Sequence, residues 1–304
     1  MNRRDFLKWN ALAGMGALAP SALSFMENQG WLFPRIVPKA KSIVILYMAG
    51  GPSQVELFDY KPQLYKHDGK MLRDVYDAPL ADNGKLVKPI TQFKQYGESG
   101  QWVSDLFPHM AGVVDEITFI KSYNASKASH LQGQLEFNTG VSFPGRPFAG
   151  DWLNYALQRP TSLLPNSFVL TDPNGQARIG SMGWNSRILP NSHSKFVFSG
   201  VENARRLLLN LVDFESMVKR FKEMEKQQSF NEELATISQK RLEDFEQIYA
   251  MREPILDIMD LSNVTSDESQ LYGLEDKESQ VFGQQLLVAR RLVEKYVPFV
   301  QIYS

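Results

Sequence analysis

The side chains that could carry out chemistry gather in two loops, and the first loop follows an apolar, β-branched run. Gly50 and Gly51 let the backbone approach a ligand closely, and their amides could bind an anion. Ser53 could act as a nucleophile, or it could cap a helix together with Glu56, which follows three residues later as a capping box requires. Asp59 could bind a hard metal ion or form a turn.

The second loop ends at His130 and contains Ser122, Ser126 and Ser129. His130 is the candidate for a metal ligand or an acid–base group, because imidazole changes its charge near neutral pH. A buried structural histidine is the alternative. Asp172 follows a third apolar run and could join the same site, although its Asp-Pro-Asn-Gly context is sufficient as a turn by itself.

Composition limits the kinds of site that the chain can form. Its 304 residues include 33 Lys and Arg against 34 Asp and Glu, four His and no Cys, with a formal net charge of -1. The balanced charge gives no support to nucleic-acid binding. Without Cys there is no disulfide, thiolate zinc site, iron–sulfur cluster or Cys nucleophile. A divalent metal ion would therefore be held mainly by oxygen ligands, with His contributing.

The first residues are similar to a signal for protein export. Arg3, Arg4 and the following Asp-Phe-Leu-Lys precede an apolar run that ends at Phe25, as in a twin-arginine signal. This run is too short, and too rich in Ala and Gly, for a stable membrane span. We predict a signal peptide at residues 1–24, a tether at 25–41, contact with the twin-arginine translocase, and a location in the periplasm or at the cell surface. A cytosolic amphipathic start with a chance pair of arginines is the alternative.

Apolar runs alternate with helical patterns along most of the chain. We predict strands at residues 42–48, 117–120, 167–171 and 298–303, and helices at residues 105–114, 147–157 and 276–296. The unbroken apolar character of residues 42–48 predicts a strand buried on both faces, whereas residues 60–104 are expected to be irregular. The alternation indicates an α/β fold, a three-layer αβα sandwich with a mostly parallel sheet. Ligands of such folds bind beyond the carboxyl ends of the strands, where both loops begin.

A helical region follows within the predicted domain at residues 42–304. An apolar stripe with helical spacing predicts two long amphipathic helices across residues 201–252, ended by Pro254. The first stripe consists of Leu207, Leu211, Phe214, Val218 and Phe221. We interpret residues 201–254 as a helical insertion, and a partner-binding coiled coil is the alternative.

Several motifs together resemble the exported bacterial family DUF1501, a domain of unknown function. They lie at residues 3–8, 48–62, 105–109, 129–130, 138–140, 144–147 and 282–294. That family is similar to the sulfatase and alkaline-phosphatase superfamily, whose members hydrolyse sulfate or phosphate esters with a bound divalent metal ion. The resemblance implies an αβα sandwich with its site at the carboxyl edge of the sheet.

The chain departs from the family pattern in three places. The superfamily places a metal-binding Asp directly after the first strand, where this chain has Ala-Gly-Gly. Many relatives have His and Asp where this chain has Gln54 and Glu56. Relatives also continue past the strand ending at Tyr303 into a Trp-Asp-x-His segment. We therefore expect the sequence ending at Ser304 to be the N-terminal part of a longer protein, poorly soluble because a strand edge would be uncovered.

Two functions follow from these residues and from the resemblance. The first is an exported, metal-dependent hydrolase of sulfate or phosphate esters, acting on a small ester or glycan and inactive in this truncated form. Ser53 would be its nucleophile, His130 a catalytic group, and Glu56, Asp59 and His130 its metal ligands or proton carriers. The second is a non-catalytic exported binding or scaffold protein that kept the sheet and lost the chemistry, which Gln54 and Glu56 favour.

Overall fold

The computed structural model describes residues 39–75, 84–157, 164–173, 179–184, 188–189, 195–210, 216, 218–220, 222–223 and 232–304. The chain divides into two compact units, Met1–Lys41 and Ser42–Ser304. The predicted signal at residues 1–24, and the tether as far as residue 38, lie outside the described residues. Within the described ranges, no helix is long and apolar enough to cross a membrane.

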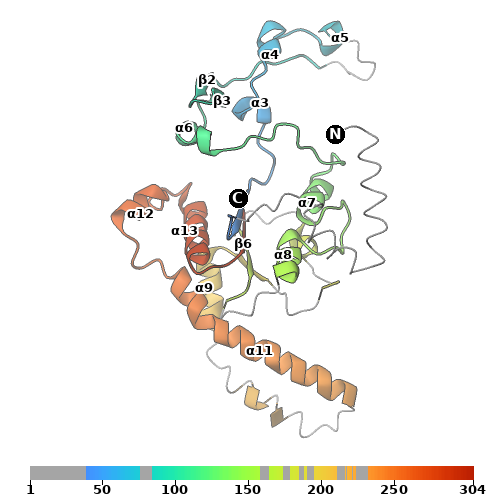
Figure 1. Ribbon diagram of the computed structural model, residues 1–304, viewed down its shortest axis with the longest axis vertical. Coiled ribbons are helices and arrows are strands. Elements are labelled where there is room, and N and C mark those ends of the chain that lie inside the picture. The colour runs from blue at the N-terminus through green and yellow to red at the C-terminus, as the bar shows by residue number, and fades with distance from the viewer. Residues whose placement is uncertain are drawn as a thin grey trace, which may run out of the picture. The chain divides into compact units, whose positions relative to one another are not determined.

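The second unit is built on a four-stranded sheet (Figure 1). In spatial order its strands are β1 (Ile43–Tyr47), β6 (Phe299–Tyr303), β4 (Ser167–Thr171) and β5 (Phe196–Ser199). All three strand pairs are parallel, so each connection must cross over a face of the sheet. The strands predicted at residues 42–48, 167–171 and 298–303 are confirmed, and so is an α/β fold with a mostly parallel sheet.

Helices cover both faces of this sheet. One face packs against α7 (His130–Thr139) and α8 (Ala149–Leu157), and the other against α9 (Val201–Leu209), the end of α11 (Glu232–Met259) and α13 (Gln280–Glu294). In β6, Phe299 and Tyr303 pack on the α7 and α8 side, whereas Val300 packs on the α13 side. This alternation is that of a strand buried between two helical layers.

The first strand is less buried than its sequence predicts. Ile43, Val44 and Leu46 are 44%, 45% and 51% exposed, so the prediction of burial on both faces is wrong. The reason is topological, because β1 pairs with β6 alone among the described strands and occupies an edge of the sheet. The central strands β6 and β4 are buried at every residue, as their two neighbours require.

The segment after β1 forms a small structure with its own core. It contains α3 (Gln54–Leu57), α4 (Pro62–Lys66), α5 (Leu72–Val75), the antiparallel pair β2 (Phe93–Tyr96) and β3 (Gln101–Ser104), α6 (Pro108–Ala111) and the 3-10 helix η1 (Val114–Glu116). Residues 60–104 are thus more regular than predicted. The helix predicted at 105–114 is present only as the short α6 and η1. Residues 117–120 form no strand, because Phe119 packs with Val103 in this separate core.

The helix predicted at residues 147–157 is confirmed as α8, and its fully buried residues are small or polar rather than large and apolar. Trp152 is 44% exposed, while Asp151 and Asn154 are buried. Local polar bonds explain the difference, since Asp151 pairs with Lys195 at 3.0 Å and the Asn154 amide donates to the Ser167 hydroxyl at 3.0 Å. Hydrophobic spacing alone does not reveal such partners.

The helical region also differs in detail from its prediction. In α9, Leu207 is 68% exposed, whereas Ala204 and Leu208 are buried. The helix α11 continues through Pro254 to Met259, so the predicted stop at Pro254 is wrong. Burial of Ile255, Ile258 and Met259 in the core offsets the backbone hydrogen bond that proline removes. The helix predicted at 276–296 is confirmed as α13 and is joined to α11 by α12 (Ser266–Leu271). The insertion limits at 201–254 stay a prediction.

Candidate functional site

The four parallel strands end together and define one edge of the sheet. Tyr47 of β1 and Thr171 of β4 both stand in register with Tyr303 of β6. The bonding continues past the strands, because the Ala49 amide donates to the Ser304 carbonyl oxygen at 2.8 Å. The loop after β1 is therefore fixed against the end of the central strand, as expected for a site at the carboxyl edge.

Gly50 and Gly51 follow directly and are exposed at this edge. Their φ angles are 93° and 72°, in the region that favours glycine. A Cβ atom at either position would meet nothing within 4 Å, so the requirement for glycine is conformational rather than a lack of space. This turn leaves backbone groups open to a ligand.

A buried polar cluster lies beside the same edge, between α7 and β6. The Tyr303 hydroxyl donates to Asn138 Oδ1 at 2.7 Å, and the Gln301 amide donates to the same oxygen at 2.9 Å and to the Tyr303 hydroxyl at 3.0 Å. Asn138 in turn donates to the Gln134 carbonyl oxygen at 2.7 Å. Burial raises the pKa of Tyr303 far above its usual value, so the phenol remains a donor.

Aromatic rings cover this cluster on the β1 side. The ring of Tyr47 lies 4.9 Å from the rings of both Phe137 and Tyr303, measured between centroids. Burial, followed by the nearby phenol of Tyr123, raises the pKa of Tyr47. On the opposite face of the sheet, the buried Gln285 amide donates to the Thr171 carbonyl oxygen at 2.8 Å. Each face of the sheet thus contributes a polar side chain whose hydrogen bonds help to fix the carboxyl edge.

Glu56 is held by a distant segment of the chain. Its Oε2 atom accepts from the amides of Ile90 and Thr91 at 3.0 Å and 3.3 Å, and lies 3.0 Å from the Thr91 hydroxyl. These bonds leave Ser53 without its expected partner. Ser53 occupies the N-cap position of α3, yet its hydroxyl makes no capping bond, so the predicted capping box is wrong.

The other predicted residues have separate surroundings. Asp59 forms an ion pair with Lys61 at 2.7 Å. His130 is exposed at the first residue of α7, so the alternative of a buried histidine is wrong. Asn138 lies eight positions further along this helix, which places His130 about 12 Å away along the helix axis. The structure therefore brings Gly50 and Gly51 to the sheet edge, but joins none of Glu56, Asp59 and His130 to another by a hydrogen bond or ion pair that is resolved among the described residues.

Among the described residues, no group of three or more His, Cys, Asp or Glu side chains could hold a metal ion. Asp172 follows β4, and its carbonyl oxygen accepts from the Ser199 hydroxyl at 3.2 Å. The sequence reasoning missed Asn138 and Gln301. One signal was available, because Gln301 interrupts an otherwise apolar strand.

The fold and this edge define an α/β protein with a parallel sheet and an open glycine turn at its carboxyl end. A family model for proteins of unknown function, DUF1501, matches residues 40–304, and the chain belongs to that family. Neither the curated proteins nor the solved structures contain a match to this chain.

Proposed function

We propose that this protein is an exported binding protein with a sulfatase-like framework, whose ligand is a sulfate or phosphate ester. The observation that supports this most is the exposed turn at Gly50 and Gly51, fixed to the end of β6 by the Ala49 bond to Ser304. Successive backbone amides bind an anion where a turn makes them converge, and we propose that role for the amides of this turn. A ligand there would lie at the edge where open parallel sheets bind ligands.

Binding is favoured over hydrolysis by the state of the two carboxylates. A divalent ion at these residues would compete with the Ile90 and Thr91 amides for Oε2 of Glu56, and with the Lys61 ammonium for Oδ2 of Asp59. Both carboxylates already have partners within the protein, which disfavours a divalent metal ion at these residues. Glu56 instead orders the segment that follows α5, which is the role of a scaffold residue.

The test titrates the full chain with phenyl sulfate and with phenyl phosphate and measures binding by calorimetry. We expect saturable binding that Gly51→Ala weakens at least tenfold. Gly69→Ala is the matched control, because Gly69 also has a left-handed φ, of 77°, with nothing within 4 Å of a built Cβ. Equal binding by all three proteins, or no binding by any, would contradict the proposal.

Metal-dependent ester hydrolysis is the second candidate. It is favoured by the Ser53 hydroxyl, which makes no capping bond and lies two residues beyond Gly51. The assay uses both esters with Mg²⁺, Ca²⁺, Mn²⁺ or Zn²⁺ in turn. Turnover that Ser53→Ala abolishes and Ser99→Ala leaves intact would establish this candidate in place of simple binding.

The proposal includes export by the twin-arginine translocase to the periplasm or cell surface. Its basis is the sequence of residues 3–8, and the test needs no knowledge of the ligand. Residues 1–41 are fused to a folded fluorescent reporter and the cells are fractionated. We expect the reporter in the periplasm, and retention in the cytoplasm when Arg3 and Arg4 are both replaced by Lys. If the reporter is exported equally well with both arginines replaced, the twin-arginine translocase is not its route and this part of the proposal is wrong.

A further inference from the structure

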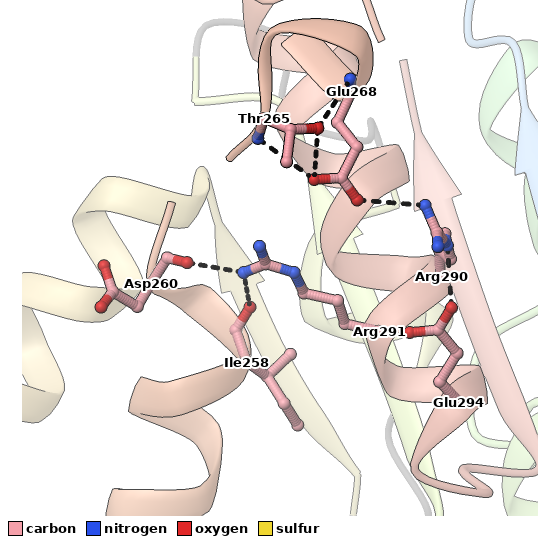
Figure 2. Close-up of polar contacts among 7 residues, drawn as sticks. All are labelled: Ile258, Asp260, Thr265, Glu268, Arg290, Arg291 and Glu294. Carbon is pink, nitrogen blue, oxygen red and sulfur yellow. Dashed lines mark hydrogen bonds and ion pairs between the residues drawn. The ribbon is translucent and has the colours of Figure 1, made fainter. Parts of the chain in front are cut away.

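The turn between α11 and α12 is braced by an arginine from a third helix. Figure 2 shows Arg291 of α13 reaching the end of α11, where it donates to the carbonyl oxygens of Ile258 at 3.1 Å and Asp260 at 2.6 Å. These carbonyl groups end a helix and have no partner within it. Arg291 therefore fixes the backbone on one side of Asp260.

A second set of bonds fixes the other side of this turn (Figure 2). Thr265 and Glu268 form a capping box at the start of α12. Arg290 then links Glu268 to Glu294, at 3.3 Å and 2.8 Å. The turn is thereby held at both ends, so a cavity beside it is organised before any ligand arrives.

Such a cavity, of about 220 Å³, lies between this turn and the start of α9. Its floor is apolar and includes Val201 and Met259, which are 3% and 1% exposed. Its polar lining includes Arg205, Asp260 and Gln284. The volume is smaller than the roughly 300 Å³ at which drug-sized pockets begin, so it suits a ligand of a single ring.

Arg205 lines the cavity with a guanidinium group whose bonding differs from that of its neighbours. Its Nε atom is buried and finds no hydrogen-bond partner among the described residues. The neighbouring Arg252 and Arg291 behave differently, because their guanidinium groups donate to backbone carbonyl oxygens. Because Nε has almost no exposed surface, a ligand could reach only the rest of the Arg205 side chain, which lines the cavity and carries the other guanidinium donors.

Asp260 supplies a negatively charged hydrogen-bond acceptor to the same cavity. The Ser262 amide donates to its carboxylate at 3.1 Å, and this bond, helped by the positive charges of Arg205 and Arg291, lowers the pKa of Asp260. The carboxylate is therefore an ionised acceptor. Glu202 also lines the cavity, so two carboxylates stand against Arg205: a bare anion is repelled on balance, and a bare cation still meets the guanidinium charge.

From this combination we infer that the cavity binds a neutral, hydroxyl-rich ring, the chemistry of one unit of a carbohydrate. Hydroxyl groups both accept from Arg205 and donate to Asp260, while the C–H face of the ring covers Val201 and Met259. The cavity lies by the end of β5, three strands across the sheet from β1, or about 14 Å. This inference is independent of the ester site at Gly50 and Gly51.

The experiment titrates the full chain with glucose, galactose and mannose, and with inorganic sulfate and phosphate for comparison, using NMR or calorimetry. We expect at least one hexose to bind with a millimolar dissociation constant, as a small neutral ligand should. Arg205→Gln should weaken that binding at least tenfold. Arg206→Gln is the matched control, because Arg206 is exposed, bonds to Asn203 and does not line the cavity. Gly51→Ala should leave hexose binding unchanged.

Two results would overturn the inference. The first is that none of the three hexoses binds, whether or not sulfate and phosphate bind through Arg205. The second is hexose binding that Arg205→Gln leaves unchanged. Circular dichroism checks that each variant folds. If Arg205→Gln does not fold, Gln284→Leu tests the same lining from α13, and unchanged hexose affinity in that variant would equally reject the inference.

Discussion

The face of the sheet that α7 and α8 cover buries polar groups, whereas the face that α9, α11 and α13 cover is mostly aliphatic. On the first face Asn138, Gln301 and Tyr303 bond to one another, and Asp151 pairs with Lys195. On the second, side chains such as Ile258 and Leu292 make an almost continuous apolar core. The same strands therefore contribute to two very different interiors.

The difference indicates which face contributes most of the stability of the fold and which face fixes the geometry of its side chains. Burying apolar area stabilises the native state without fixing directions, so the aliphatic face can contribute most of the free energy of folding. Buried polar groups contribute little net free energy, yet each requires a partner in one geometry. The polar face lies directly beside the carboxyl edge, where Tyr303 ends the central strand and geometry matters for a ligand.

The largest effect should come from breaking the buried ion pair on the polar face. Lys195→Met leaves the carboxylate of Asp151, which is 0% exposed, without its cation, and we expect a loss of about 4 kcal/mol in the free energy of unfolding. Chemical denaturation measures it. Lys88→Met is the control, because the Lys88 pair with Asp68 is exposed to solvent and its loss should cost far less than loss of the buried pair. Similar losses of unfolding free energy in both variants would show that burial does not make the Asp151–Lys195 pair more important for stability.

The aliphatic face should respond to size rather than to polarity. Ile258→Ala, at a side chain only 3% exposed, should cost about 3 kcal/mol in the free energy of unfolding. It also tests whether core contacts beyond Pro254 keep α11 helical. Leu207→Ala on α9 is the control, since Leu207 is 68% exposed and should change stability by less than about 0.5 kcal/mol. If Ile258→Ala lowered the free energy of unfolding as little as Leu207→Ala does, this end of α11 would not be packed against the core.

The central elements of this fold could be predicted because their signals are local. The apolar runs of β4 and β6 and the stripe of α13 need only their own residues to be recognised. The burial of β1 could not be predicted in the same way, since it depends on which strands lie beside it. The continuation of α11 past Pro254 likewise depends on core contacts made by residues beyond it.

The candidate site was harder to predict for the same reason. The spacing of Ser53 and Glu56 fits a capping box, but a partner 35 positions away, Thr91, takes the carboxylate instead. The turn at Gly50 and Gly51 could be expected from sequence, because a left-handed turn after a strand has few other solutions, whereas ligand binding by these residues stays a prediction. The cluster around Asn138 joins residues more than 160 positions apart, and no spacing rule reaches that far.

A smaller effect is expected at the polar cluster itself. Tyr303→Phe removes the hydroxyl that donates to Asn138, but Gln301 still donates to the same oxygen, so the cost should be about 1 kcal/mol. Tyr123→Phe, at a ring 69% exposed, is the control and should be neutral. Equal stability of Tyr303→Phe and the parent protein would mean that this cluster contributes order alone.

The same variant has a pH signature. Because burial raises the pKa of Tyr303 above its ordinary value of 10.0, the unfolded phenol ionises first and stability must fall as pH rises above 10. The Phe variant should lose stability less steeply there, by up to about 1.4 kcal/mol per pH unit. Denaturation at several alkaline pH values measures both slopes, and parallel slopes would contradict the raised pKa.

The smallest effect should be a gain, at the end of the aliphatic layer. Tyr296 follows α13 with a φ of 63°, in the position that a helix end usually gives to glycine, and the Val297 amide donates to the Leu292 carbonyl oxygen at 3.0 Å. Its ring is 74% exposed, so Tyr296→Gly loses little packing. Relief of left-handed strain should exceed the added entropy of the unfolded chain and stabilise the protein by about 0.5 kcal/mol. Tyr296→Ala keeps the strain and removes the same ring, so a gain in the Ala variant as large as in the Gly variant would assign the effect to the ring instead.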